Sequence, residues 1–443
     1  MMFRETIYAL SSGALPSAVA VIRLSGPHVR EALTRIVGFV PEPRQLVLAT
    51  MRNSSGEQID RGFVSYFAAP ASFTGEDAAE LDSHGGKAVV AALLKELSSI
   101  AGLRPADPGE FARRAYLNGK FDLTGAEALG DLIEAETEGQ RRFAVANTGG
   151  RTAALYQGWR ERIIHTRAMI EAELDFADEG DIPESIGSTV LSSVTELRQE
   201  ILSHIEGYST AEILREGFQV ALIGPPNAGK SSLLNALVKR DVAIVSDEPG
   251  TTRDLVVVNL DLGGMKIVLT DTAGIREGAG KVEQQGVERA RHAAGSAHLV
   301  LRLQDITAPP SFGLKDEYTD EIVVLTKIDL DERVSVGDPP DPGHLAVSAK
   351  TGEGLDALLA LLQERATKAT GATGGFVPFR ERHLVHLREA ERLLGEFSAA
   401  RNLGLELQAE LLRGASLALG RIIGDVDVED LLDVIFSRFC VGK

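Results

Sequence analysis

The sequence predicts a protein of mixed α/β and α class, in which an inserted α/β domain divides a helical bundle into two parts. Strand-like and helix-like apolar runs alternate over residues 1–118, which indicates an N-terminal α+β domain. Apolar residues at helical spacing dominate residues 119–216 and return in residues 369–443. Between these parts, residues 217–368 begin with a strand, a glycine-rich loop and a helix. We interpret this order as an insertion, because insertions succeed where the two chain ends of the host lie close together.

The N-terminal domain shows both kinds of pattern. Strand-like runs cover Val19 to Leu24 and Gly62 to Phe67, and a helix is expected from Lys87 to Ile100. The turn from Ser11 to Pro16 separates two strands, so this N-terminus is not expected to be a secretory signal.

The helical parts carry apolar side chains on one face, which we interpret as bundle core. Thr124 and Glu127 have the spacing of a capping box that would begin the first helix. A Gly/Thr-rich linker from Ala366 to Gly375 precedes the second part. The apolar positions are Trp159, Ile163, Ile170 and Leu174 in the first part and Leu384, Leu387, Leu394 and Phe397 in the second.

Composition limits the possible functions. The 443 residues include 46 basic and 64 acidic side chains, a net charge of −18, which argues against a general nucleic-acid binder. Cys440 is the single cysteine, so an internal disulfide is excluded and a reducing compartment is expected. No apolar stretch approaches the roughly 20 residues of a membrane span. We therefore expect a cytoplasmic protein that does not enter a membrane.

Residues 224–231, Gly-Pro-Pro-Asn-Ala-Gly-Lys-Ser, form a complete phosphate-binding loop. In such a loop backbone N–H groups converge on phosphates, Lys230 reaches the β- and γ-phosphates, and the Ser231 hydroxyl can ligate magnesium. A buried strand from Gly217 to Ile223 precedes the loop, and a helix from Ser232 to Val238 follows it. The chain is expected to bind a nucleoside triphosphate in a Ras-like P-loop GTPase domain.

Three later motifs identify the nucleotide. Asp271-Thr272-Ala273-Gly274 places a carboxylate near the magnesium shell, and Thr326-Lys327-Ile328-Asp329 and Ser348-Ala349-Lys350 are guanine-recognition elements. The Asp329 carboxylate can accept from the N1–H and amino group of guanine, which adenine lacks, so the ligand is predicted to be GTP. The predicted GTP-binding residues are Asn227, Ala228, Gly229, Lys230, Ser231, Ser232, Ser246, Thr251, Thr252, Asp271, Thr272, Ala273, Gly274, Thr326, Lys327, Asp329, Ser348, Ala349 and Lys350.

The guanine motif departs from its usual form, because Thr326 stands where an Asn is usual. The replacement removes an amide that normally bridges the base and the phosphate loop. Guanine selectivity with altered affinity is expected.

Hydrolysis needs an oriented water and a positive charge near the γ-phosphate. Ile275 occupies the place of the usual water-orienting Gln, and spacing alone leaves Glu277, Glu283 and Glu288 as alternatives. The first switch is expected at Val245 to Arg253, with Thr252 completing the magnesium shell.

Asn227 suggests a source of the positive charge. Its side-chain oxygen and the backbone carbonyls between Ser246 and Thr251 could hold a potassium ion where an arginine finger otherwise acts. The alternative for Asn227 is a hydrogen bond that stabilises the loop.

Several sequence motifs together resemble one family. They are AVAVIRLSG (18–26), SFTGEDAAEL (72–81), PGEFARRAYLNGKFDL (108–123), the phosphate loop, GTTRD (250–254), DTAGIRE (271–277) and the final FCVGK (439–443). Over the whole chain they are similar to the bacterial and organellar tRNA uridine-modification GTPases, the MnmE or TrmE family.

The resemblance implies a homodimer that works with the flavoprotein MnmG (GidA), a FAD carrier, in a heterotetramer. The family adds a carboxymethylaminomethyl or aminomethyl group at C5 of the wobble uridine of tRNA. The carbon comes from 5-formyl- or 5,10-methylene-tetrahydrofolate in the N-terminal domain. Matching the family's folate motifs selects Arg23, Glu80, Lys120 and Lys443.

The resemblance also implies roles in hydrolysis. Glu283 orients the attacking water, and Lys230 is the phosphate-contacting lysine. The implied potassium ligands are Asn227, Ser246, Glu248 and Thr251, and the implied magnesium ligands are Ser231 and Thr252. Cys440 has two readings, a catalytic thiol beside the folate or a structural tail residue.

Two other functions compete with a potassium-stimulated, tRNA-modifying GTPase. A ribosome-assembly GTPase switch without synthetic chemistry would carry a basic RNA-binding flank, whereas this chain is acidic. A folate transferase with a regulatory nucleotide site would keep its chemistry when hydrolysis is abolished.

Overall fold

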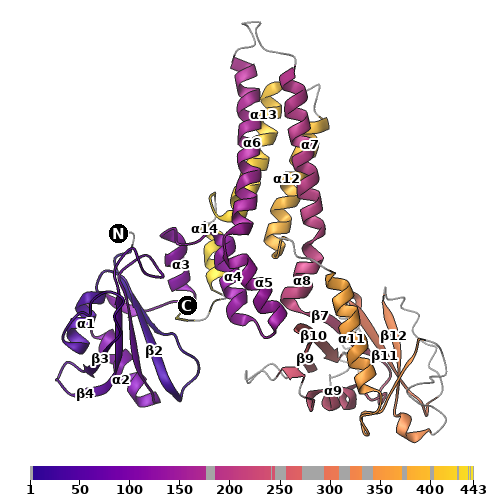
Figure 1. Cartoon of the computed structure of the whole chain (residues 1–443), viewed down its shortest axis with the longest axis horizontal. Coiled ribbons are helices and arrows are strands. Elements are labelled where there is room, and N and C mark those ends of the chain that lie inside the picture. Colours follow the sequence, from indigo (N-terminus) through magenta and orange to yellow (C-terminus); the bar gives the residue numbers. More distant parts are fainter. Residues whose placement is uncertain are drawn as a thin grey trace, which may run out of the picture. The chain divides into compact units, whose positions relative to one another are not determined.

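The computed structural model describes residues 3–175, 185–240, 242–244, 256–271, 294–308, 320–331, 343–371, 377–399, 404–426, 429–437, 439 and 441–442. The chain divides into two compact units, and Figure 1 labels their helices and strands. The first comprises Met1–Gly130, Thr148–Val194 and Leu393–Lys443, and the second comprises Asp131–Asn147 and Thr195–Arg392. Among the described helices, none is both long and apolar enough to cross a membrane.

The first unit contains a six-stranded sheet in the order β3-β4-β5-β2-β1-β6. β1 and β6 pair in parallel, and the other neighbours pair antiparallel. Ile22, Leu33 and Leu93 belong to one buried cluster that joins the sheet to helices α1 and α2. The elements are β1 (Thr6–Leu10), β2 (Ser17–Ser25), α1 (Val29–Val37), β3 (Val47–Arg52), β4 (Gln58–Phe67), β5 (Ala78–Gly85), α2 (Lys87–Ser98) and β6 (Leu103–Pro105).

The opposite face of this sheet is covered in part. Ile7 and Ala9 of β1 are buried against Ala106 and Phe111, at the start of α3 (Glu110–Leu117). Phe63 alternates with the buried Val64 along β4 and is 46% exposed. The sheet therefore has a packed end at β1 and an open apolar region at β4.

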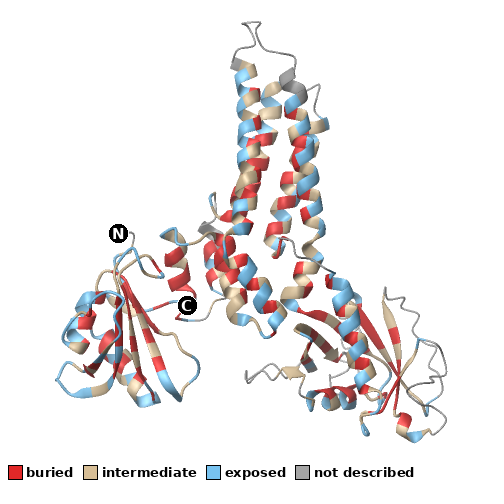
Figure 2. Cartoon of the chain, in the orientation of Figure 1, coloured by how far each residue is buried: buried red, intermediate tan, exposed pale blue. Residues whose placement is uncertain are grey.

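The helical region of the first unit is built on α6 (Arg151–Asp175), which packs along α13 (Leu405–Ile423). Trp159, Ile163 and Ile170 are buried, as their spacing predicted, whereas Leu174 is half-buried. Figure 2 shows buried residues along the helices of this region. α14 (Glu429–Phe436) also belongs to this unit. Among the described helices, four have residues in both units, namely α4 (Leu123–Glu134), α5 (Glu138–Thr148), α7 (Ser185–Glu206) and α12 (Glu381–Ala399).

The capping box predicted at Thr124 and Glu127 is wrong. α4 begins at Leu123, and Asp122 caps it by accepting the Gly125 N–H at 2.9 Å and the Thr124 hydroxyl at 2.5 Å. The Asp122 carboxylate precedes the first turn, where it is a better acceptor for the free N–H groups than a hydroxyl within that turn.

A reciprocal capping box is present at α5 (Glu138–Thr148) instead. The Gln140 N–H donates to Thr137 Oγ1 at 3.3 Å, and the Thr137 N–H donates to Gln140 Oε1 at 3.1 Å. These paired bonds satisfy two donors at the start of α5.

The second unit contains a seven-stranded sheet in the order β13-β12-β11-β7-β10-β9-β8. The first five of these strands run parallel, so their carboxyl ends share one edge, where α/β sheets bind ligands. The elements are α8 (Tyr208–Glu216), β7 (Phe218–Ile223), α9 (Lys230–Val238), β8 (Ala243–Ile244), β9 (Val256–Leu262), β10 (Met265–Asp271), β11 (Leu299–Asp305), β12 (Glu321–Thr326), η1 (Ile328–Leu330), β13 (Leu345–Val347) and α11 (Leu355–Thr370).

The described core of the second sheet contains a large apolar cluster and a smaller one that includes Ala221 and Val300. Val220 and Leu222 of β7 pack with Leu234 of α9 and Leu358 of α11. The alternation of these buried residues fixes the strand register, so each motif that follows a strand emerges at the same edge.

Candidate functional site

The phosphate loop joins the end of β7 to the start of α9. Gly224 has φ 148°, and a Cβ there would lie 2.5 Å from the Leu303 carbonyl oxygen. Gly229 precedes α9 with φ 92°, and Asn227 adopts φ 63°, which is uncommon for a residue with a side chain. The two glycines thus permit a tight loop in front of a helix N-terminus, the arrangement that binds phosphate.

Lys230 lies across this loop and is 6% exposed. Its Nζ donates to the carbonyl oxygens of Gly224 at 2.7 Å and Pro225 at 2.9 Å. Burial lowers the pKa of Lys230, and the nearby Asp271 opposes that shift in part. The ammonium group is therefore held by loop carbonyls at the place where a phosphate would bind.

Ser231 and Asp271 form the described part of the expected magnesium site. Asp271 ends β10 and is fully buried, and the Ser231 hydroxyl donates to its Oδ2 at 3.1 Å. A hydroxyl next to a carboxylate offers the oxygen ligands that magnesium prefers. The residues present therefore fit the ion.

The guanine elements meet at the ends of β12 and β13. The Ser348 hydroxyl donates to Asp329 Oδ1 at 2.7 Å, and Lys350 Nζ lies 3.8 Å from Asp329 Oδ2. The Thr351 N–H donates to Ser348 Oγ at 3.1 Å. Two motifs that are separate in the sequence thus hold the Asp329 carboxylate, the group predicted to recognise guanine.

Thr326 corrects part of the expectation for the altered guanine motif. It is 4% exposed, and its hydroxyl donates to the Ala228 carbonyl at 2.7 Å. The link between the guanine segment and the phosphate loop is therefore kept by a hydroxyl. What the replacement of Asn by Thr removes is the amide group that would contact the base.

Ten residues of the predicted site lie outside the described part of the chain. They are Ser246, Glu248, Thr251, Thr252, Thr272, Ala273, Gly274, Glu283, Cys440 and Lys443.

A second group of predicted residues meets on the first sheet. Arg23 donates from Nε and Nη2 to Glu80 Oε1 at 3.1 and 2.9 Å, across the paired strands β2 and β5. The Arg23 guanidinium carbon lies 5.7 Å from the ring centre of Phe73 and 6.0 Å from that of Phe111. Lys120 donates to the Pro70 carbonyl at 2.9 Å, in the loop that carries Phe73. Three of the four predicted folate residues, Arg23, Glu80 and Lys120, therefore lie at the loop that carries Pro70 and Phe73 or on the strands β2 and β5.

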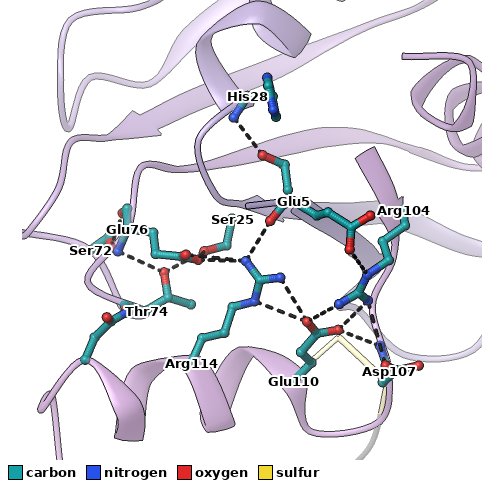
Figure 3. Close-up of polar contacts among 12 residues, drawn as sticks. Glu5, Ser25, His28, Ser72, Thr74, Glu76, Arg104, Asp107, Glu110 and Arg114 are labelled. Carbon is teal, nitrogen blue, oxygen red and sulfur yellow. Dashed lines mark hydrogen bonds and ion pairs between the residues drawn. The ribbon is translucent and has the colours of Figure 1, made fainter. Parts of the chain in front are cut away.

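A buried ionic network holds this loop (Figure 3). Arg114 is 1% exposed, and it donates to Glu110 Oε1 at 2.9 Å and Glu76 Oε2 at 3.1 Å. Arg104 donates to the second oxygen of Glu110 at 2.7 Å. Burial would raise the pKa of Glu110, but the bonds from Arg104, the Asp107 N–H and Arg114 outweigh it and the pKa lies below its usual range.

Glu76 connects this network to the strand that carries Arg23. The Ser25 hydroxyl donates to Glu76 Oε2 at 2.7 Å and lies 2.6 Å from the Thr74 hydroxyl. Sequence reasoning gave no role to Phe73, Glu76, Phe111 or Arg114, although all four lie in the quoted motifs. The aromatic residues Phe73 and Phe111, one in each motif, were the sequence signal that could have pointed to a site for a flat ring.

The C-terminal segment reaches the same sheet. The Ser11 hydroxyl donates to the Gly442 carbonyl at 2.8 Å, immediately after the end of β1. Gly442 has φ 95°, and a Cβ there would lie 2.4 Å from the Leu10 carbonyl oxygen. Only glycine fits this close approach without a shift of the backbone.

The strand order, the phosphate loop and the Asp329 cluster together define a GTP-binding protein of the P-loop GTPase class. Residues 6–120 match the model described as GTP-binding protein TrmE N-terminus, and residues 123–440 match the model of the MnmE helical domain. The chain belongs to the MnmE family of GTPases.

Close relatives span the full length of the chain. It is 54% identical over 441 residues to the tRNA modification GTPase MnmE of Chelativorans sp. (strain BNC1), with 99% of this chain and 98% of the relative covered. The MnmE of Mesorhizobium japonicum is 52% identical, and that of Rhizobium meliloti is 50% identical, each with both chains fully covered.

Two solved structures are similar to part of the chain. The G domain of the Thermotoga maritima FeoB iron transporter is 27% identical, covers 34% of this chain and 98% of its own, and has a TM-score of 0.26. Aquifex aeolicus Era bound to GDP and aluminium fluoride is 24% identical over 40% of this chain and 66% of its own, with a TM-score of 0.27.

Proposed function

We propose that the chain is a potassium-stimulated GTPase that controls the addition of a carboxymethylaminomethyl or aminomethyl group to C5 of the tRNA wobble uridine. The Arg23–Glu80 pair carries this proposal, because a GTPase switch without synthetic chemistry has no need of a second ligand site. The full-length relatives named tRNA modification GTPase support the same conclusion.

Arg23, Glu80, Lys120 and Lys443 would hold a tetrahydrofolate, which supplies the one-carbon unit as 5-formyl or 5,10-methylene. Glu80 offers acceptor oxygens for the amino-pyrimidinone edge of a pterin, and the cationic side chains suit an anionic glutamate tail. The rings of Phe73 and Phe111 beside Arg23 provide apolar surface for the flat pterin. The Ser11 bond to Gly442 supports a place for Lys443 at this sheet. Cys440 keeps both readings.

In the nucleotide site, Ser231 and Thr252 would hold magnesium, and Asn227, Ser246, Glu248 and Thr251 would hold potassium. A bound cation supplies positive charge near the γ-phosphate. The ammonium group of Lys230 at the loop would add positive charge near the same phosphate. Glu283 is proposed to orient the attacking water. Turnover in potassium should therefore exceed turnover in sodium at equal ionic strength, whereas equal rates would remove the potassium ligands from the account.

The hairpin of β9 and β10 supports a link between hydrolysis and the helical region. It connects the predicted first switch, which precedes Val256, to the segment after Asp271. At its tip the Gly264 carbonyl accepts the Gly139 N–H at 2.9 Å, at the start of α5. Lys266 Nζ lies 2.5 Å from Glu136 Oε2 next to this contact. Movement of the switches would therefore reach α5 through a hydrogen bond and an ion pair.

The open face of the first sheet supports a homodimer. Val19, Leu48 and Phe63 are 55%, 50% and 46% exposed, and Leu48 lies opposite Phe63 in the pairing of β3 with β4. A second copy of this unit would bury these side chains.

We further propose three domains, with an N-terminal domain over 1–118, a helical domain over 119–216 and 369–443, and a GTPase domain over 217–368. The partner would be a FAD-containing flavoprotein of the MnmG type in a heterotetramer. The chain would act in the cytoplasm, where tRNA is available.

A label-transfer experiment tests this function. The chain, the flavoprotein, GTP, tRNA, a nitrogen donor (glycine or ammonium, in separate reactions) and tetrahydrofolate labelled in its one-carbon unit are incubated together, and label in the tRNA is measured. Glu80→Gln should abolish transfer and leave GTP hydrolysis intact, whereas the control Glu42→Gln, at an exposed position, should behave as wild type. Absence of transfer by the wild-type chain would favour the GTPase switch without synthetic chemistry.

A further inference from the structure

The guanine motif has a third anchor, which lies at the end of β11. Asp305 is paired with Thr326 in the register of β11 and β12, so their carboxyl ends lie side by side. Lys327 Nζ donates to Asp305 Oδ2 at 2.6 Å. Asp305 therefore binds the side chain of the motif's second residue.

The Asp305 carboxylate is itself fixed in orientation. Its Oδ1 accepts the Thr307 N–H at 2.9 Å and the Thr307 hydroxyl at 2.7 Å, which leaves Oδ2 for Lys327. Burial would raise the pKa of Asp305, but the hydrogen bonds from Lys327 and Thr307 outweigh it, and the pKa lies below its usual value. The group is thus an oriented carboxylate and an acceptor for a cation.

Lys327 needs such an anchor. Its backbone is left-handed, with φ 62°, and its side chain is 37% exposed while that of Asp305 is 15% exposed. The lysine stem has four rotatable bonds and would otherwise sample many rotamers. Binding of a base next to a free lysine would have to order that stem at an entropic cost.

The motif is then held by three different elements. Thr326 is hydrogen-bonded to Ala228 in the phosphate loop, and Asp329 is hydrogen-bonded to Ser348 after β13. Lys327 is bonded to Asp305 after β11. We propose that Asp305 is a positioning residue for guanine nucleotide binding, which acts by ordering Lys327 before the nucleotide arrives.

Asp305→Asn tests this role in the full chain, with a fluorescent GDP as the probe. The amide keeps the shape and an acceptor for Thr307 and loses the charge that holds the lysine. The dissociation constant of GDP should rise about fivefold to tenfold. The turnover number at saturating GTP should stay near the wild-type value, because Asp305 does not contact the reacting phosphate.

Glu321→Gln is the matched control. It weakens the ion pair of Arg302 with Glu321, which joins the same two strands away from the guanine motif. Its effect on GDP affinity should be negligible, which separates the proposed role from a general weakening of the β11–β12 pairing.

A double-mutant cycle with Lys327→Gln identifies the route of the effect. If Asp305 acts through Lys327, Asp305→Asn adds nothing to the loss of affinity that Lys327→Gln causes. Wild-type GDP affinity in Asp305→Asn, or a full additive loss in the double variant, would overturn the proposal. A variant that fails to fold would also contradict it, because Asp305 would then serve the fold instead of Lys327.

Discussion

The Thr326 hydroxyl donates to the Ala228 carbonyl at 2.7 Å and so joins the guanine-recognition segment to the phosphate loop. Thr326→Val removes the donor and leaves a buried carbonyl oxygen without it, at a cost of about 1–3 kcal/mol. We expect GDP to bind about tenfold more weakly, measured by titration with a fluorescent nucleotide. Thr326→Ser keeps the hydroxyl and should bind as wild type, and equal weakening in both variants would assign the effect to packing.

Gly139→Ala should separate hydrolysis from modification. A Cβ at Gly139 would lie 2.5 Å from the Gly264 carbonyl oxygen, so the contact between α5 and the β9–β10 hairpin must open. We expect the GTPase rate to stay within about twofold of wild type while tRNA modification falls about tenfold, a loss of ~1.4 kcal/mol in coupling. Gly158→Ala is the control, because no atom lies within 4 Å of its added Cβ. A parallel change of both activities in Gly139→Ala would contradict a coupling role.

Arg114→Met should destabilise the first unit. The substitution removes the guanidinium, 1% exposed, that pairs with Glu76 and Glu110, and breaking such buried pairs costs about 3 kcal/mol or more. Unfolding in urea, followed by circular dichroism, measures this loss. Arg413→Met removes an exposed ion pair with Glu410 and should cost much less stability, because water screens the two charges. Similar losses in the two variants would show that the network adds no stability.

His298 predicts a pH dependence of stability in the second unit. Its Nδ1 accepts the Gln219 N–H at 2.9 Å, which requires the neutral ring. Burial lowers its pKa from the ordinary 6.5, with Glu216 opposing in part. Below about pH 6.5 the unfolded chain therefore binds a proton that the folded chain does not. The free energy of unfolding decreases as the pH is lowered, until the pH is below the pKa of His298 in the folded chain.

His298→Asn tests this dependence. The Asn side chain offers an oxygen acceptor that does not titrate in this range, so urea midpoints of the variant between pH 7 and pH 5 should decline less than those of wild type. Identical slopes in the two proteins would assign the pH dependence to another group.

The local parts of this molecule could be predicted from its sequence, and the long-range contacts could not. The phosphate loop and the guanine motif each lie within a few consecutive residues, where spacing fixes geometry. The bonds of Lys327 with Asp305 and of Arg114 with Glu76 join residues 22 and 38 positions apart, and they depend on strand order and register. The misplaced capping box at Thr124 is a local exception, because the spacing of Thr124 and Glu127 fitted the pattern while the carboxylate of Asp122, two residues earlier, provided the cap.

The central claim is that GTP hydrolysis by this chain controls modification of the tRNA wobble uridine. Its most direct test is mass analysis of wobble nucleosides from cells that lack the chain and carry wild type, Lys230→Ala or Lys239→Ala, an exposed lysine after α9. Wild type and Lys239→Ala should restore carboxymethylaminomethyl- or aminomethyl-uridine, and Lys230→Ala should leave uridine unmodified at this carbon. Wild-type levels of the modified nucleoside in cells without the chain, or full restoration by Lys230→Ala, would contradict the account.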